Sequence, residues 1–344
     1  ATTHYKKEFS QDHRIDLMAG VTQQNFITNR FTGNASNFAS QIMRTNSMQS
    51  AQSDLYTINT NTSKYSLLSY IGRANYSLMD KYLFTATFRA DGSSRFGEDN
   101  KYGYFPSFAF GWKLGEEQFI QDLDVFSNLK FRASWGQTGN QAIGNYNSLI
   151  TFGTGPNANL DQSLVTTFDP SRIPNPGLKW ETTEQTNIGF DIGFLSNRIY
   201  GSMDLFNKTT RDMLIQLPVP PSTGFGSKLQ NIGSIKNTGF EFMVTSRNVV
   251  GEFNWTTSFN FTTMKNEVLS IGDIPEIIHI GAGWSGDIAI IREGEPLNSF
   301  YGYEVVGVWQ EGDDFDGTKD PVVPGDQKYA DINGDSVVNA DDRQ

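Results

Sequence analysis

The segment Leu68-Ser69-Tyr70-Ile71-Gly72-Arg73-Ala74-Asn75-Tyr76-Ser77-Leu78 alternates between two kinds of side chain. Its even positions hold leucine, tyrosine, glycine and alanine, whereas its odd positions hold serine, arginine and asparagine, with Ile71 as the exception. After Met79-Asp80-Lys81 the alternation resumes over residues 82–91, where Leu83 is the exception. A period of two residues places the two sets on opposite faces of a β-strand. We therefore predict one aromatic and aliphatic face and one polar face.

The same alternation recurs along the chain and predicts nine strands. They cover residues 15–22, 68–78, 82–91, 107–114, 129–136, 185–194, 199–210, 239–246 and 253–263. A weaker tenth candidate lies at residues 300–308. Strands of about ten residues with one apolar and one polar face are typical of a wall between lipid and water. The predicted fold class is all-β, an antiparallel transmembrane β-barrel of which the chain supplies about nine or ten strands.

The links between these strands alternate in length. The short links are residues 79–81, 196–198 and 248–252, and the long polar ones are residues 23–63, 140–182, 218–236 and 266–298. Outer-membrane barrels have short periplasmic turns and long extracellular loops. We therefore expect the long links to be extracellular and residues 115–128, by parity, to be periplasmic. Residues 266–344 are expected to form one extracellular excursion.

Composition narrows the classes of protein further. Hydrophobic residues make up 37% of the chain, but aromatic residues reach 13%. This composition suits a barrel in which one face of each strand contacts water, rather than a disordered chain. No apolar run approaches the roughly 18–20 residues of a membrane helix. The net charge of −11 argues against a nucleic-acid partner. The absence of cysteine excludes disulfides and thiolate metal sites, and the first residues lack the apolar core of a signal peptide.

A soluble β-sandwich or β-helix is the alternative to the membrane barrel, because its strands alternate as well. Strands in such folds are usually shorter, near five or six residues. Structureless loops as long as those expected here are also unusual in a compact soluble domain. The periodicity by itself favours the membrane barrel about two to one.

Five phrases of the chain, in order, resemble one family. They are residues 88–97 (FRADGSSRFG), 103–107 (GYFPS), 129–140 (LKFRASWGQTGN), 175–187 (NPGLKWETTEQTN) and 265–267 (KNE). They resemble the SusC/RagA family of TonB-dependent outer-membrane transporters, over the chain from about residue 13 to its end. The resemblance implies a barrel of about 22 strands with an N-terminal plug in its lumen. Residues 1–344 are then expected to be an incomplete barrel domain that lacks the plug and the C-terminal strands.

The resemblance also implies a function and partners. It implies import of an oligosaccharide or peptide across the bacterial outer membrane, with a SusD-like surface lipoprotein that closes over the barrel mouth. Energy would come from the TonB–ExbB–ExbD complex through the absent plug, and outer-membrane lipid would surround the wall. No cofactor is implied.

The acidic segment 311–344 holds one metal-binding motif. It carries ten acidic and three basic residues, and residues 331–342 resemble an EF-hand or dockerin loop. The expected Ca²⁺ ligands are Asp331, Asn333, Asp335, Asn339 and Asp342, with the backbone carbonyl of Val337. Ser336 replaces the usual turn glycine, and Asp342 is shorter than the usual bidentate glutamate. A hydrated acidic turn is the alternative to a structural calcium site.

Catalysis has little support, and we predict no enzyme. Three histidines are scattered, and no nucleophile–base motif or phosphate-binding loop appears. Glu181 with Glu184 could imitate a glycosidase pair, and Asp91 could form a charged cluster with Arg89 and Arg95. Lumen-facing polar residues explain both sets more simply.

Four loop aromatics could stack on sugar rings or belong to membrane-interface girdles. They are Tyr146, Phe168, Trp180 and Trp284. For Trp180 the girdle is the better interpretation. The competing function is a secreted, calcium-stabilised β-rich binding or adhesion module, followed by a β-helix polysaccharide lyase.

Overall fold

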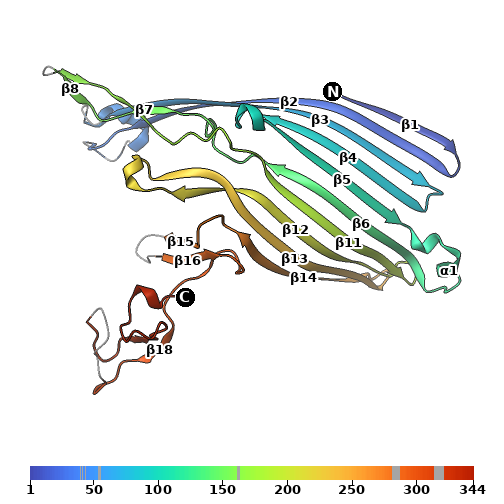
Figure 1. Ribbon diagram of the computed structural model, residues 1–344. Helices are drawn as coiled ribbons and strands as arrows, with labels where there is room; N and C mark the ends of the chain where they lie inside the picture. The colour runs from blue at the N-terminus through green and yellow to red at the C-terminus, as the bar shows by residue number, and fades with distance from the viewer. Residues whose placement is uncertain are drawn as a thin grey trace.

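One antiparallel sheet of ten strands dominates the computed structural model (Figure 1). The structure describes residues 1–38, 40, 42, 44–52, 56–160, 163–280, 287–313 and 321–344. In sheet order the strands are β1 (Thr2–Ser10), β2 (His13–Asn34), β3 (Thr57–Leu78), β4 (Tyr82–Ser93), β5 (Tyr102–Trp112), β6 (Phe126–Asn140), β11 (Glu181–Phe194), β12 (Ile199–Pro218), β13 (Ser227–Val249) and β14 (Trp255–Ser270). Each strand pairs with the next along the sheet, and β1 and β14 are the outermost strands described. The all-β antiparallel prediction is confirmed.

The remaining elements are short and lie in the links. The short strands are β7 (Phe152–Thr154), β8 (Ala158–Leu160), β9 (Ser163–Val165), β10 (Phe168–Pro170), β15 (Glu276–Ile280), β16 (Asp287–Arg292), β17 (Ser299–Phe300), β18 (Val305–Val308) and β19 (Gln327–Tyr329). The helices are α1 (Gln118–Gln121) and the 3-10 turns η1 (Arg44–Ser50), η3 (Glu98–Asn100), η4 (Leu114–Glu116), η5 (Pro221–Thr223) and η7 (Ala340–Asp342). Within the described residues, no helix is long and apolar enough to cross a membrane.

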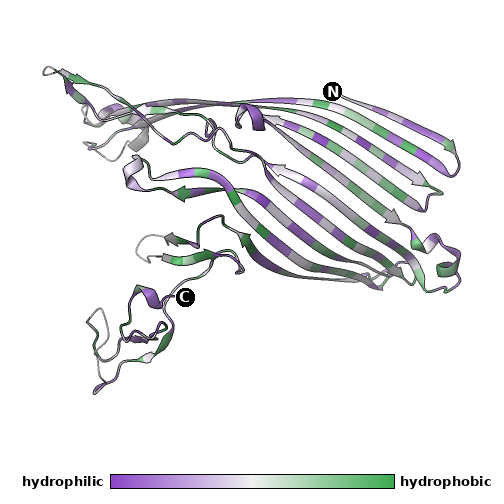
Figure 2. Ribbon diagram, in the orientation of Figure 1, coloured by the Kyte–Doolittle hydropathy of each residue, from purple (hydrophilic) through white to green (hydrophobic). Residues whose placement is uncertain are grey.

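Strand register aligns like with like across the sheet. One row of directly opposed residues is Tyr76, Phe84, Phe110, Ala133 and Ile188. The neighbouring row on the other face is Asn75, Thr85, Ala109, Ser134 and Asn187. Figure 2 shows the resulting alternation of hydrophobic and hydrophilic positions along the strands. The sheet therefore has an apolar face and a polar face, as the alternation predicts.

The predicted strand ends were wrong in several places. Strand β1 was missed, and β2 and β3 continue into both ends of the link predicted at residues 23–63, pairing from Gln23–Leu68 to Asn34–Thr57. Strands β12 and β13 likewise extend into the link predicted at residues 218–236. In these extensions the regular alternation of apolar and polar residues ends, while the backbone ladder continues. The weak candidate at residues 300–308 forms only short pieces outside the large sheet.

A tight turn joins β3 to β4 at the short-link end of the sheet. Met79 and Asp80 have φ values of 51° and 52°, and the Lys81 amide donates to the Leu78 carbonyl at 3.0 Å. Two successive residues with positive φ define the type I′ turn that matches the twist of a hairpin. The Asp80 carboxylate accepts hydrogen bonds from Lys113 at 2.9 Å and Arg14 at 3.2 Å, and it thereby ties three strand ends together.

Glu117 ties the same end of the sheet to the link that carries α1. Its carboxylate accepts hydrogen bonds from the Tyr82 hydroxyl at 2.8 Å, Trp112 Nε1 at 3.1 Å and Lys81 Nζ at 3.1 Å. The donation from Trp112, followed by those from Tyr82 and Lys81, lowers the pKa of Glu117 below its usual value of 4.5. The charged carboxylate is therefore favoured in the folded protein.

The Glu117 network predicts a pH-dependent contribution to stability. Because the folded-state pKa is lowered, the contribution is fully present above the ordinary pKa and is lost as pH falls through the folded value. In the full-length protein, Glu117→Gln should therefore lower Tm at about pH 7 and have little effect at about pH 3. Glu116→Gln, at the exposed neighbouring position, is the matched control. An effect of Glu117→Gln that does not change with pH would contradict this assignment.

Candidate functional site

The polar face carries an arginine that spans three strands. Arg132 on β6 donates from Nε to the Asp191 carboxylate at 3.0 and 3.1 Å, and from Nη1 and Nη2 to Asp204 at 3.0 Å each. Gly189 lies opposite both Arg132 and Asp204, and a Cβ there would lie 2.3 Å from an Asp204 oxygen. The glycine therefore leaves room for the guanidinium to reach across β11. Paired charges of this kind make a fixed, water-compatible surface.

A second ion pair lies nearer the long-link end of the same face. Arg89 Nε donates to both Asp91 oxygens at 2.7 Å, and Arg89 Nη2 donates to the Ser69 hydroxyl at 3.2 Å. Arg95, the third member of the predicted cluster, is not part of it. Its guanidinium lies 3.8 Å from the Tyr65 ring centre and donates to Asn145 at 2.8 Å. That cluster prediction was therefore right for one pair and wrong for Arg95.

Glu181 and Glu184 do not form a carboxylate pair. The residues are three positions apart on β11, so their side chains lie on opposite faces of the sheet. Glu181 accepts a hydrogen bond from Asn140 at 3.2 Å, whereas Glu184 accepts one from Arg211 at 3.0 Å. A glycosidase needs two carboxyl groups that flank one bond. The glycosidase interpretation is therefore wrong.

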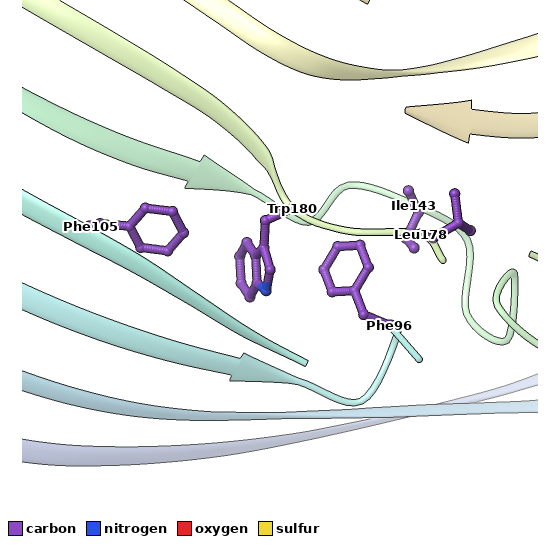
Figure 3. Close-up of a cluster of buried hydrophobic side chains, with 5 residues drawn as sticks. All are labelled: Phe96, Phe105, Ile143, Leu178 and Trp180. Carbon is purple, nitrogen blue, oxygen red and sulfur yellow. The ribbon is translucent and has the colours of Figure 1, made fainter. Parts of the chain in front are cut away.

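Five buried side chains form a cluster, here called the aromatic anchor, where the long links leave the sheet (Figure 3). They are Phe96, Phe105, Ile143, Leu178 and Trp180. Each comes from the long-link end of a strand or from the link beside it: β4, β5, β6 and β11 all contribute. Burying such side chains stabilises a fold by about 1.5–3 kcal/mol each. The anchor therefore fixes the starts of the long links against the sheet.

Trp180 lies at the centre of the aromatic anchor. Its ring centre is 5.2 Å from that of Phe96 and 5.5 Å from that of Phe105, the latter in an edge-on arrangement. Its Nε1 donates to the Lys101 carbonyl at 3.0 Å. Trp180 is buried, so both of its predicted positions, in a membrane-interface girdle and in an open sugar-stacking surface, were wrong.

Two glycines make room for the aromatic anchor. A Cβ on Gly139 would lie 2.0 Å from the Phe105 ring, and a Cβ on Gly97 would lie 2.2 Å from the Pro176 carbonyl oxygen. Contacts this short are incompatible with any side chain, and the Pro176 backbone has little freedom to move. Both glycines are therefore required by close packing.

Polar contacts extend the aromatic anchor to β13. Asn231 accepts a hydrogen bond from the Lys179 amide at 3.0 Å and donates to the Lys179 carbonyl at 2.8 Å. Asn175 donates to the Leu229 carbonyl at 2.9 Å. The segment before β11 is thus bound both to its neighbours in the anchor and to a strand two places further along the sheet.

Four of the five quoted phrases meet at this location. Phe96, Phe105, Gly139 and Trp180 each come from a different phrase. Their glycine and aromatic content was the signal that could have indicated a packed junction rather than open loops. Of the other loop aromatics, the Tyr146 hydroxyl accepts a hydrogen bond from the Lys64 amide at 2.9 Å, and Phe168 is exposed. Trp284 lies outside the described residues.

The predicted calcium ligands fold into one closed turn. Asp331 accepts hydrogen bonds from the amides of Gly334 at 2.7 Å and Ser336 at 2.8 Å. Asn333 accepts from the Asp335 amide at 2.8 Å, and Asp335 in turn accepts from Val337 at 2.8 Å. Ser336 has a φ of 68°, so it adopts the left-handed conformation for which glycine is usually chosen.

Asp342 closes this turn from inside. It is fully buried, and its carboxylate accepts hydrogen bonds from the amides of Ile332 at 2.8 Å, Asn333 at 3.3 Å and Asn339 at 2.8 Å. The amide of Asn339, ahead of the others, lowers the pKa of Asp342. One Asp342 oxygen already accepts two amides, so this arrangement does not offer the bidentate ligand of an EF-hand.

The calcium site therefore stays a prediction. Among the described residues, no group of three or more acidic or histidine side chains is arranged to hold a metal. The predicted set instead mixes carboxylates, amides and a carbonyl around a turn closed by its own amides. If it binds Ca²⁺, titration calorimetry on the full-length protein should give a Kd of about 10⁻⁴ M, as in extracellular modules. Asp331→Asn should abolish that binding, whereas Asp326→Asn, outside the turn, should not; the absence of any heat in the wild type would reject the site.

Residues 2–336 match a family described as TonB dependent receptor-like, beta-barrel. The chain is 35% identical to TonB-dependent receptor P26 of Formosa agariphila, in an alignment that covers 99% of this chain. It is 34% identical to TonB-dependent receptor SusC of Bacteroides thetaiotaomicron, in an alignment that covers 96% of this chain. These alignments cover 35% and 32% of the relatives, so the chain spans about a third of their length. The solved RagAB peptide transporter aligns over all of this chain and 36% of its own, with a TM-score of 0.81 and 27% identity.

Proposed function

The chain belongs to the TonB-dependent receptor-like β-barrel family of outer-membrane proteins, and we propose that it is part of the wall of a nutrient importer. The two-faced sheet is the observation that carries this proposal. Its apolar face suits lipid, and its polar face holds Arg132 between Asp191 and Asp204. The proposed whole protein has a barrel of about 22 strands around a plug, with this chain as ten of them.

We propose an oligosaccharide or a peptide as the imported nutrient. The likeness to SusC and to the RagAB peptide transporter supports an importer, and the choice between the two substrates is left to experiment. The polar face offers paired charges and hydroxyls, which suit a hydrated cargo of either kind. The relatives bear receptor and transporter names, which supports a role without catalysis.

We propose two partners for the whole protein. A SusD-like surface lipoprotein would cover the extracellular end, and TonB–ExbB–ExbD would act through the plug. Exposed apolar side chains in the links support a protein partner there: Leu164 on β9 is 75% exposed and Phe168 on β10 is 69% exposed. Such side chains mark interaction surfaces more often when they gather than when they are scattered.

Uptake by the native host tests the proposal. A strain that lacks the gene for the full-length protein should fail to take up one labelled pool, either oligosaccharides or peptides, and the wild-type gene should restore uptake. Deletion of tonB should abolish the same uptake, because energy must reach the plug. Unchanged uptake of both pools in the deletion strain, or recovery of the protein in culture supernatant rather than outer membrane, would contradict the proposal. The second outcome would favour the secreted binding module.

A further inference from the structure

The apolar face is hollowed rather than smooth. A hollow of about 520 Å³ lies over β3, β4, β5, β6 and β11, where three alanines of the apolar face are bordered by aromatic rings. The alanines are Ala74, Ala86 and Ala133, and the rings are those of Tyr76, Phe84, Phe108, Phe110 and Trp135. Small side chains between large ones leave a groove on the side that faces lipid.

A second hollow continues the first. It also measures about 520 Å³, lies over β11 to β14, and is lined by Leu205, Phe240 and Lys265 among others. The two hollows share Thr186 and Ile188 in their linings, so they are neighbours on the apolar face, and together they are called the groove here. This groove ends at a lysine.

The groove extends from near the inner border of the apolar band to its outer border. Ala74 lies four residues from the short-link end of β3, whereas Lys265 lies ten residues from that end of β14. At about 3.3 Å per residue and a tilt of about 45°, Ala74 lies roughly 9 Å and Lys265 roughly 23 Å above the inner border. An apolar band is about 25 Å tall, so Lys265 lies at the outer border.

The charges at the outer end of the groove are mostly positive. Outward positions here hold three cations, Arg211, Lys236 and Lys265, and two carboxylates, Glu184 and Glu267. Arg211 Nη1 lies 3.0 Å from a carboxylate oxygen of Glu184, and Lys265 Nζ lies 3.4 Å from one of Glu267. Lys236 is opposite Thr209 on β12 and Glu267 on β14 in the strand register. One positive charge therefore remains, among hydroxyl and amide groups that can donate hydrogen bonds.

We propose that this groove binds one anionic lipid of the outer leaflet, with its head group at Lys236 and Lys265 and an acyl chain in the hollows. An acyl chain is already in an apolar medium, so the hollows supply packing rather than a hydrophobic driving force. Selectivity for an anionic lipid must therefore come from the lysines. The inference rests on the membrane wall alone and is independent of the imported substrate.

Lipid retained by the purified full-length protein tests this site. The protein would be extracted from native outer membranes in mild detergent, and its bound lipids identified and counted by native mass spectrometry. The double variant Lys236→Gln/Lys265→Gln should retain roughly twenty-five-fold less anionic lipid, about five-fold for each lysine. Lys208→Gln is the matched control, because Lys208 is exposed on the polar face of the neighbouring strand β12.

A second variant keeps the proposal falsifiable if the lysine changes disturb assembly. Ala133→Phe fills the first hollow while it leaves the lysines in place, and it should also reduce retention of the anionic lipid. Retention of neutral lipid should not change in any of the variants. Equal retention of anionic lipid by wild type and both variants would overturn the proposal and leave only ordinary lipid contact at this face. The absence of anionic lipid from the wild-type protein would overturn it as well.

Discussion

Replacing Trp180 with alanine is expected to cost about 3–5 kcal/mol in the local stability of the links at the long-link end of the sheet. Trp180 is buried between Phe96 and Phe105, and its Nε1 donates to the Lys101 carbonyl. The variant would leave a cavity, and the Lys101 carbonyl without its hydrogen bond, where the links leave four strands of the sheet. The sheet itself should persist, because its ladder does not depend on this side chain.

Limited proteolysis of whole cells measures this effect. Residues 141–180 should be cleaved at least ten times faster in Trp180→Ala than in the wild type, because the local opening becomes more frequent. Trp180→Phe keeps a ring but loses the hydrogen bond, so it should cost only about 1–2 kcal/mol. Trp255→Ala, at an exposed position on β14, is the control for loss of a tryptophan. Equal cleavage in Trp180→Ala and wild type would mean that the aromatic anchor does not hold these links.

A charge placed on the apolar face should have the second-largest effect. Phe108 is 57% exposed on this face of β5, about four residues from the short-link end and therefore roughly 9 Å inside the apolar band, which is about 25 Å tall. Phe108→Arg should lower the free energy of unfolding in lipid vesicles by about 2–4 kcal/mol. Loss of the stacked Phe108–Trp135 pair, with ring centres 6.1 Å apart, adds about 0.5–1.5 kcal/mol.

The neighbouring residue provides the control. Ala109 is exposed on the polar face opposite Ser134 and Thr85, so Ala109→Arg should cost less than about 1 kcal/mol. Urea unfolding of the full-length protein in vesicles gives both values. Similar decreases in the free energy of unfolding for Phe108→Arg and Ala109→Arg would mean that both faces of the sheet contact the same medium.

Local periodicity predicted the membrane-spanning part of nine of the ten strands in the sheet, because lipid selects apolar side chains at every second position. Where strands extend beyond lipid, that selection ends, and the signal was lost. The continuation of β2 to Asn34 is mostly polar in this way. Strand β1 pairs with residues 13–20 of β2, inside the membrane-spanning part, and it was missed because its polar residues, two lysines and a glutamate among them, obscure the alternation. These segments are strands because the neighbouring backbone pairs with them, which alternation cannot reveal.

The candidate site was less predictable for a different reason. The phrases around Phe96, Gly139 and Trp180 were recognisable, but their meeting depends on links that bring residues about 40 to 80 positions apart together. The Arg132 pairs with Asp191 and Asp204 likewise depend on strand register, which one sequence does not reveal. The calcium motif is local and could be identified directly in the sequence. In the structure, however, its carboxylate oxygens accept hydrogen bonds from backbone amides of its own turn.

Accessibility along β3 tests most directly the claim that the sheet separates lipid from water. Residues 1–344 contain no cysteine, and single cysteines at residues 69–76 of the full-length protein, with any cysteine elsewhere replaced by serine, can each carry a nitroxide label. In outer membranes, labels at Tyr70, Ala74 and Tyr76 should collide mainly with oxygen, which dissolves in lipid. Labels at Ser69, Arg73 and Asn75 should collide mainly with a water-soluble nickel chelate. A period of two in the ratio of the two collision rates is the predicted result, and equal ratios at even and odd positions would contradict the transmembrane wall.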